Sequence, residues 1–110
     1  MAEPTLIAAV QMNSTPVVAD NLATAARLLQ QARDAGAVLA ALPENFAIMG
    51  ARDTDKLAFA EPLGHGPIQD WLADTAQQLG LWIVAGTVPV AVDGDPSRVW
   101  AASLVFDASG

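Results

Sequence analysis

One carboxylate, Glu44, is the residue of this sequence whose type and surroundings best suit catalysis. It stands directly after the apolar residues 37–42 and Pro43, and Asn45 and Phe46 follow it. Apolar neighbours would remove part of the water around this carboxylate, which suits it to accept a proton from a nucleophile near neutral pH. In the alternative interpretation Glu44 is structural, and it caps a following turn or pairs with an arginine. The residues alone leave both interpretations open.

His65 is a weaker candidate, because it lies in the string Gly64-His65-Gly66-Pro67 with no catalytic partner in view. A histidine between two glycines is typical of an exposed loop, and no serine is placed to form a triad with it. The same string lacks the third glycine of a dinucleotide-binding loop, and Pro67 has no N–H to offer an anion. A nucleotide-binding α/β domain is therefore a weak alternative.

The other charged and aromatic candidates are expected on the surface or in the core. Lys56, the only lysine, stands among acidic residues, so we expect a solvated surface charge. Arg52 and Arg98 are free to bind a carboxylate, although a single arginine is not a specific signal. The three tryptophans are interpreted as core or interface residues of helices or strands: Trp71, Trp82 and Trp100.

The composition excludes several classes of protein. With 110 residues, 53% of them hydrophobic, the chain can bury a core and makes up at most one domain. Twelve acidic against five basic residues result in a formal net charge of −7, so we expect no nucleic-acid partner. The absence of cysteine excludes a disulfide, a thiolate metal site and a cysteine nucleophile within this sequence.

No part of the sequence is typical of a secretion signal or a membrane span. Residues 1–11 lack a basic region, and their apolar stretch is shorter than that of a signal peptide. The longest apolar run, residues 81–92, is too short for a bilayer and contains Gly86 and Pro89. We therefore expect a cytoplasmic protein with no membrane partner.

The elements expected around Glu44 make an α/β fold with a mixed sheet, in the order β-α-β-loop-α-β-β. Two buried strands, residues 5–12 and 37–42, enclose an amphipathic helix over residues 20–35, and such a βαβ unit makes its strands parallel. Asp20 is the expected N-cap of that helix, and Gly36 is expected just past its end.

The second half is expected to end in a hairpin. Its elements are an irregular loop with a short helical piece (48–62), a helix that begins at Pro67 and ends at Gly80, and two antiparallel strands (81–92 and 98–106) joined by a turn at 93–96. Glu44 would stand just past the end of a strand, where open α/β sheets bind their ligands.

Several strings in the sequence resemble the N-terminal part of the nitrilase superfamily of carbon–nitrogen hydrolases. They are L-I-A-A-V-Q-M-N-S, N-L-A-T-A-A-R-L-L, A-A-L-P-E-N-F, G-P-I-Q-D-W-L, G-L-W-I-V-A-G-T-V-P and A-S-L-V-F-D-A-S-G. The resemblance covers all 110 positions in register, and L-P-E-N-F with the downstream G-T-V-P is specific. Within the superfamily the chain is most similar to the Nit-type amidases, the deaminated-glutathione amidase and ω-amidase branch.

The resemblance implies a four-layer α-β-β-α sandwich and a Glu-Lys-Cys catalytic set that uses no metal or organic cofactor. In that set the cysteine attacks an amide or nitrile carbon, the glutamate acts as general base, and the lysine stabilises the tetrahedral intermediate. Only the glutamate carries over to this sequence, and it falls on Glu44. The family's lysine and cysteine would come after Gly110, and Lys56 does not match that lysine.

Residues 1–110 are therefore expected to be the N-terminal portion of a single carbon–nitrogen hydrolase domain that is incomplete at its C-terminus. We expect this chain to be inactive by itself and one face of its sheet to be uncovered. In the full-length protein we expect a small-molecule amide substrate and a homo-oligomer. The string P-E-N-F-A-I-M-G favours the deaminated-glutathione type over ω-amidase. The alternative is a non-catalytic binding or interaction domain built on the same scaffold.

Overall fold

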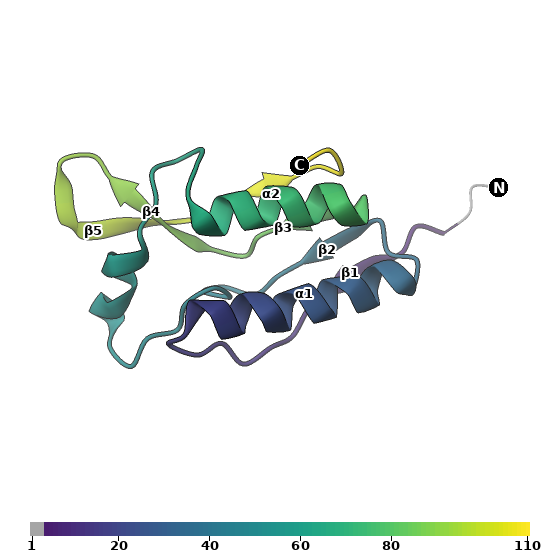
Figure 1. Cartoon of the computed structure of the whole chain (residues 1–110), viewed down its shortest axis with the longest axis horizontal. Coiled ribbons are helices and arrows are strands. Elements are labelled where there is room, and N and C mark those ends of the chain that lie inside the picture. Colours follow the sequence, from purple (N-terminus) through teal and green to yellow (C-terminus); the bar gives the residue numbers. More distant parts are fainter. Residues whose placement is uncertain (1–3) are drawn as a thin grey trace.

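The computed structural model describes residues 4–110, which form two helices, a short 3-10 helix and six strands. Figure 1 shows both helices packed along one side of a sheet, with a hairpin extending beyond one end of it. In chain order the elements are β1 (Ile7–Ala9), α1 (Val18–Asp34), β2 (Leu39–Ala41), η1 (Asp53–Phe59), α2 (Pro67–Leu79), β3 (Trp82–Val84), β4 (Val88–Val92), β5 (Asp95–Ala102) and β6 (Val105–Phe106).

The main sheet is mixed, as the sequence predicts. Its strand order is β1-β2-β3-β6, in which β1, β2 and β3 are parallel and β6 is antiparallel to β3. Each helix connects two neighbouring parallel strands, so the chain forms two consecutive βαβ units. The α/β fold with a mixed sheet is thus confirmed.

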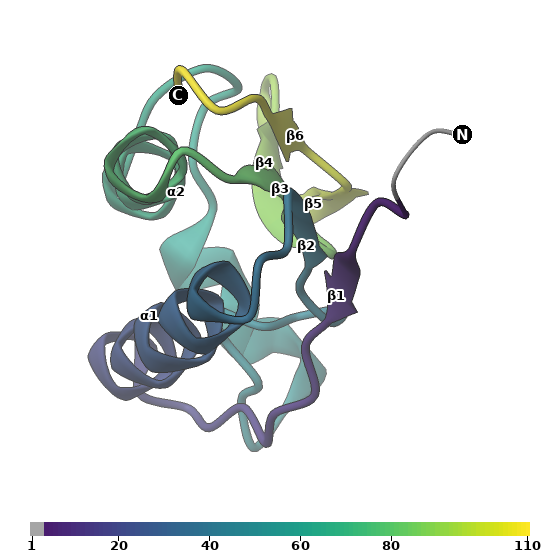
Figure 2. The same cartoon turned by 90° about the vertical axis from the view of Figure 1, so that its right-hand side faces the viewer.

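Both helices cover the same face of the main sheet, as the end-on view in Figure 2 shows. The side chains that this face contributes, Ala40 and Ile83, are fully buried. They meet Leu29 of α1 and Leu72 of α2, which are also fully buried. Alternate residues of a strand point to opposite faces, so this core uses only one residue in two of each strand.

The opposite face of the main sheet is uncovered and apolar. Ile7 of β1, Trp82 of β3 and Val105 of β6 are 65%, 47% and 58% exposed. Leu39 and Ala41 of β2 are half-buried, so this strand, predicted to be buried, is fully buried only at Ala40. The expectation of an uncovered sheet face is confirmed.

The strand predicted over residues 81–92 is two strands in two sheets. Gly86, with φ +59°, lies between β3 and β4 and turns the chain out of the main sheet. The strand predicted over 98–106 is likewise divided into β5 and β6. The predicted antiparallel hairpin is confirmed as β4–β5, and its turn is confined to Asp93 and Gly94.

The helix ends were predicted with mixed success. Asp20 is not the N-cap of α1, because the helix begins at Val18 and its N-cap is Val17, which makes no side-chain cap hydrogen bond. Gly36, with φ +97°, follows the helix as predicted. Both predicted ends of α2 are confirmed, since Pro67 begins it and Gly80 closes it with φ +59°. The short helical piece predicted in the loop is η1, a 3-10 helix of seven residues.

No helix within residues 4–110 is long and apolar enough to cross a bilayer.

Candidate active site

Glu44 lies just past β2, at the carboxyl edge of the parallel strands, where the sequence predicts it. Its side chain is exposed, so the expected partial removal from water is wrong for this chain. Within the described part of the chain the carboxylate accepts no hydrogen bond and forms no ion pair. The structural alternative, in which Glu44 caps a turn or pairs with an arginine, therefore finds no support here.

The backbone around Glu44 is fixed by the end of β3 and the segment that follows it. The N–H of Leu42 donates to the Val84 carbonyl at 2.8 Å, and the N–H of Asn45 donates to Thr87 Oγ1 at 3.0 Å. Asn45 has φ +55°, the only positive φ of a non-glycine residue within residues 4–110. These bonds hold the residues on both sides of Glu44.

Gly86 allows the two segments to approach this closely. A Cβ at this position would overlap the carbonyl oxygen of Pro43, and its φ of +59° already disfavours any side chain. The first two residues of the G-T-V-P string therefore have a structural role: Gly86 makes room for the loop that carries Glu44, and Thr87 binds that loop.

A buried amide holds the far side of the same loop. Asn21 of α1 is 1% exposed, and its Nδ2 donates to the carbonyls of Ala47 and Thr15 at 2.8 and 2.7 Å. Its Oδ1 accepts from the N–H and Oγ1 of Thr15 at 2.8 and 3.1 Å. In addition, Ser14 Oγ donates to the Phe46 carbonyl at 2.7 Å. Sequence reasoning missed Asn21, since a polar residue inside an amphipathic helix is ordinarily expected on its exposed side.

The aromatic ring after Glu44 anchors the loop in the core. Phe46 is fully buried, and its ring centroid lies 6.2 Å from that of Trp71 in α2. The core prediction is confirmed for Trp71, which packs against the buried cluster. The other two tryptophans, Trp82 and Trp100, are 47% and 63% exposed, so they are not core residues of this chain.

A second carboxylate, Glu61, is buried at the start of α2. It is 7% exposed and accepts hydrogen bonds from the N–H groups of Ile68 and Gln69, at 2.6 and 3.1 Å, and from Gln69 Nε2 at 3.1 Å. Its backbone pairs with β4 through Glu61 N–H to Pro89 O and Ala91 N–H to Glu61 O. A Cβ at Gly66 would overlap its side chain. An acidic residue shortly before a helix that begins with proline was the available sequence signal.

The remaining predicted site residues are not brought together with Glu44 in one cluster. His65 is exposed in its loop, as expected. Lys56 is half-buried, and within residues 4–110 it forms no ion pair. Arg52 and Arg98 are both engaged within the chain, since their Nε atoms lie 3.5 Å from Asp55 Oδ1 and 2.7 Å from Asp95 Oδ2.

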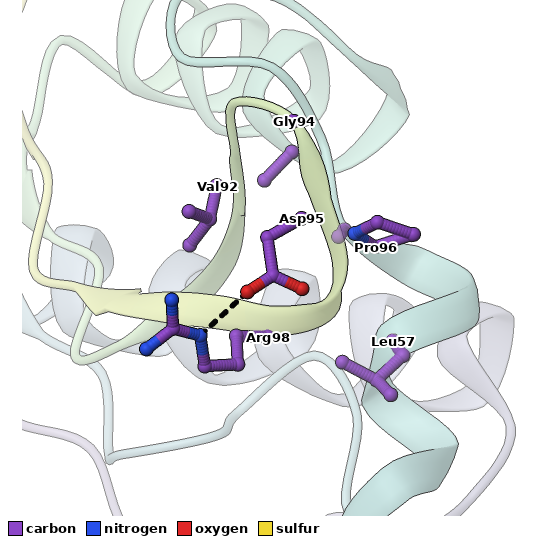
Figure 3. A pocket seen from close by; sticks show the side chains of 8 residues that line it. Leu57, Val92, Gly94, Asp95, Pro96 and Arg98 are labelled. Carbon is purple, nitrogen blue, oxygen red and sulfur yellow. Dashed lines mark hydrogen bonds and ion pairs between the residues drawn. The ribbon is translucent and has the colours of Figure 1, made fainter.

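Figure 3 shows the Arg98–Asp95 pair at the edge of an open cavity of about 410 Å³ on the β4–β5 hairpin. Hydrogen bonds from the side chain of Ser97, then from Arg98, then from the Ser97 N–H lower the pKa of Asp95 below its ordinary value of 3.8. This carboxylate therefore serves as a hydrogen-bond acceptor within its own turn. Among the described residues no cluster of three or more His, Asp or Glu side chains could hold a metal ion.

The mixed sheet, the two βαβ units and the fixed loop carrying Glu44 define an α/β scaffold that places a carboxylate at the carboxyl edge of its parallel strands. The model of the carbon–nitrogen hydrolase family matches residues 6–110, and the chain belongs to this family.

Curated relatives of the chain are amidases. It is 34% identical over 108 residues to the deaminated glutathione amidase of Synechocystis, covering 98% of this chain and 39% of the relative. It is 37% identical over 81 residues to the human deaminated glutathione amidase, covering 74% of this chain and 24% of the relative. An ω-amidase of Xenopus laevis is 29% identical over 102 residues. The chain thus spans about two fifths of the length of the first of these relatives.

Solved structures share the fold. The Caenorhabditis elegans NitFhit protein superimposes with a TM-score of 0.82 over 94% of this chain and 25% of its own, at 20% identity. Nit3 of Saccharomyces cerevisiae, described as a member of branch 10 of the nitrilase superfamily, superimposes with a TM-score of 0.73 at 24% identity, covering 89% of this chain and 37% of its own. These likenesses establish the nitrilase-superfamily fold for the chain.

Proposed function

We propose that this chain supplies the general base, Glu44, of a thiol amidase that hydrolyses the C–N bond of a small carboxamide. The observation that carries the proposal is the placement of Glu44 in a chain of this family. The carboxylate stands past β2 with no partner of its own within residues 4–110, on a loop held by Thr87 on one side and Asn21 on the other. A carboxylate in a fixed position that makes no other bond is available to accept a proton.

In the proposed reaction Glu44 removes the proton of a cysteine thiol, and the thiolate forms a bond to the amide carbon. The C–N bond then breaks, the proton passes from Glu44 to the leaving nitrogen, and ammonia departs from a thioester. Water gives a proton to Glu44 while its oxygen bonds to the thioester carbon. The C–S bond then breaks, the carboxylic acid leaves, and the thiolate takes the proton back from Glu44. A lysine ammonium stabilises the oxyanion of both tetrahedral intermediates.

The cysteine and the lysine of this mechanism would belong to sequence outside these 110 residues. The chain contains no cysteine, and its single lysine, Lys56, lies on η1 rather than after the hairpin. We propose that residues 1–110 act as the N-terminal portion of one hydrolase domain. By themselves they are expected to be inactive.

The substrate we propose is an amide of the deaminated-glutathione type. Several curated relatives carry this name, while the ω-amidase of Xenopus laevis is less similar. An ω-amide of a keto acid is the nearest alternative. Assays of the complete hydrolase with a deaminated tripeptide and with an ω-amide of a keto acid compare the two, and equal kcat/KM values would contradict our preference.

The test of the catalytic role is Glu44→Gln in the complete hydrolase. We expect kcat to fall by at least about a hundredfold, because the amide side chain cannot accept the thiol proton. Asp70→Asn, which removes one exposed carboxylate from α2, is the matched control and should retain activity. Full activity of Glu44→Gln would overturn the proposal.

A second candidate is a non-catalytic interaction domain, and the uncovered apolar face of the main sheet favours it. Ile7, Trp82 and Val105 on this face would be covered by further sequence of the same domain in the first candidate and by another polypeptide in the second. Absence of hydrolysis by the complete protein, together with stable binding of a second protein to this face, would support the interaction domain instead.

A further inference from the structure

The starts of α1 and α2 and the 3-10 helix η1 enclose a cavity that Glu44 does not line. In Figure 1 both helices begin at the end of the molecule where η1 lies. The cavity has a volume of about 330 Å³, and Val18 of α1, Phe59 of η1 and Ile68 of α2 line it. A volume of this order equals that of about eleven water molecules at about 30 Å³ each, so it accommodates a small organic molecule.

The walls of this cavity are mainly apolar and are open to water at Phe59. This side chain is 39% exposed, Val18 is half-buried, and Ile68 is 3% exposed. Burial of apolar surface is the main favourable contribution to binding in most small-molecule sites. Phe59 is the largest apolar residue of the lining, and an apolar ligand body in the cavity would cover the exposed part of its ring.

Glu61 also lines the cavity, and one acceptor position of its carboxylate is unused. Its Oε1 accepts from the N–H and the Nε2 of Gln69, both at 3.1 Å, whereas Oε2 accepts only from the Ile68 N–H, at 2.6 Å. Each oxygen of an ionised carboxylate has two acceptor positions, so Oε2 retains one. Within residues 4–110 no Lys, Arg or His nitrogen lies within 4.0 Å of this buried carboxylate. The cavity therefore offers a charged acceptor that no basic residue of the described chain neutralises.

The charges around the cavity favour a cation over an anion. The N-terminus of a helix contributes about half a positive charge, which is less than the full negative charge of Glu61. The first turns of α1 and α2 add Asp20 and Asp70, so each helix end carries a carboxylate of its own. Lys56, the basic residue of η1, lines a different cavity beside Asn45. An ammonium group at Glu61 Oε2 would therefore meet a net negative environment.

We propose that this cavity binds a small primary amine with an apolar body, whose ammonium group donates a hydrogen bond to Glu61 Oε2. The body packs against Val18, Phe59 and Ile68, and the remaining N–H groups stay in water at the open side of the cavity. A hydrogen bond between an ammonium group and a carboxylate is about twice as strong as one between neutral groups. The site does not contain Glu44, so binding of this ligand is independent of the proposed amidase reaction.

The experiment compares two ligands of the same size and shape in the complete hydrolase: 2-phenylethylamine, which is an ammonium ion near neutral pH, and 2-phenylethanol, which is neutral. Isothermal titration calorimetry measures both dissociation constants. We expect the amine to bind at least about tenfold more tightly, and Glu61→Gln to reduce this preference to less than about threefold. Asp70→Asn removes an exposed carboxylate that does not line the cavity, so it is the matched control and should keep the preference.

A second pair of variants tests the apolar wall without changing a charge, and it decides the matter if Glu61→Gln does not fold. Phe59→Ala should weaken the binding of both ligands about fivefold. Leu63→Ala, at an exposed apolar residue that does not line the cavity, is its control and should change neither dissociation constant. Glu44→Gln should also leave both constants unchanged, because Glu44 does not line the cavity.

Four results would overturn the proposal. The first is a lack of saturable binding of the amine to the wild type, and the second is equal affinity of the wild type for the amine and the alcohol. The third is a preference for the amine that persists in folded Glu61→Gln, and the fourth is unchanged affinity in Phe59→Ala. Weaker amine binding in Glu44→Gln would place the ligand at the proposed active site and would overturn it as well.

Discussion

The carbonyl oxygen of Pro43 lies against the α-carbon of Gly86, and no space for a side chain separates them. This contact joins the loop that carries Glu44 to the segment that leaves β3, and the bond from Asn45 to Thr87 lies beside it. The position of the candidate general base therefore depends on a residue more than forty positions away in the sequence.

We predict that Gly86→Ala destabilises the chain by at least about 2 kcal/mol, because it combines an unfavourable positive φ with a steric overlap. Gly80→Ala is the matched control, since Gly80 has the same φ of +59° and a Cβ there would meet no atom within 4 Å. Urea unfolding measures the unfolding free energy of both variants. Both share the cost of the positive φ, so the difference between them is the cost of the overlap with Pro43. Equal losses would show that the Pro43 contact adds nothing.

Asn21→Asp is predicted to destabilise the Glu44 loop by about 2–4 kcal/mol. The carboxylate cannot donate to the carbonyls of Ala47 and Thr15, and burying a charge there adds a further cost. Gln31→Glu, at an exposed position of the same helix, is the control and should cost less than about 0.5 kcal/mol. Hydrogen exchange of the loop amides measures the effect, and protection equal to the wild type would contradict the role of Asn21.

Glu61→Gln is predicted to cost about 1–3 kcal/mol in unfolding free energy. Three N–H donors converge on this carboxylate, and an amide can offer them only one acceptor oxygen. Asp70→Asn removes the same charge from the same end of α2 without breaking a side-chain hydrogen bond of the described structure, so it separates charge from hydrogen bonding. If both variants lose a similar amount of unfolding free energy, Glu61 stabilises α2 only through its charge near the positive end of the helix dipole.

The isolated 110-residue chain is predicted to self-associate through the uncovered face of the main sheet. Trp82→Asp should shift its sedimentation towards the monomer, because the charge would be placed within the apolar face. Trp100→Asp is the control, since Trp100 is still more exposed but lies on the β4–β5 hairpin. A monomeric wild type with cooperative unfolding would contradict this prediction.

The sequence by itself determined the element types, the parallel βαβ unit and the placement of Glu44 past the end of a strand. These features depend on local periodicity and on Pro and Gly at the helix ends, which are readable over short stretches. The sequence strings around Glu44 and Gly86 were also enough to identify the family, which the family model confirms. The divided strands were not predicted, because an apolar run shows that residues avoid water but not which sheet they join.

Only the tertiary structure decided how the Glu44 loop is held and which charges surround it. Asn21 and Thr87 bind backbone groups 26 and 42 positions away in the sequence, and no local pattern encodes such pairings. The exposure of Glu44 and the half-burial of Lys56 likewise depend on which surfaces other segments cover. Burial is a property of packing between elements, so residues of the same type and spacing can end in different environments.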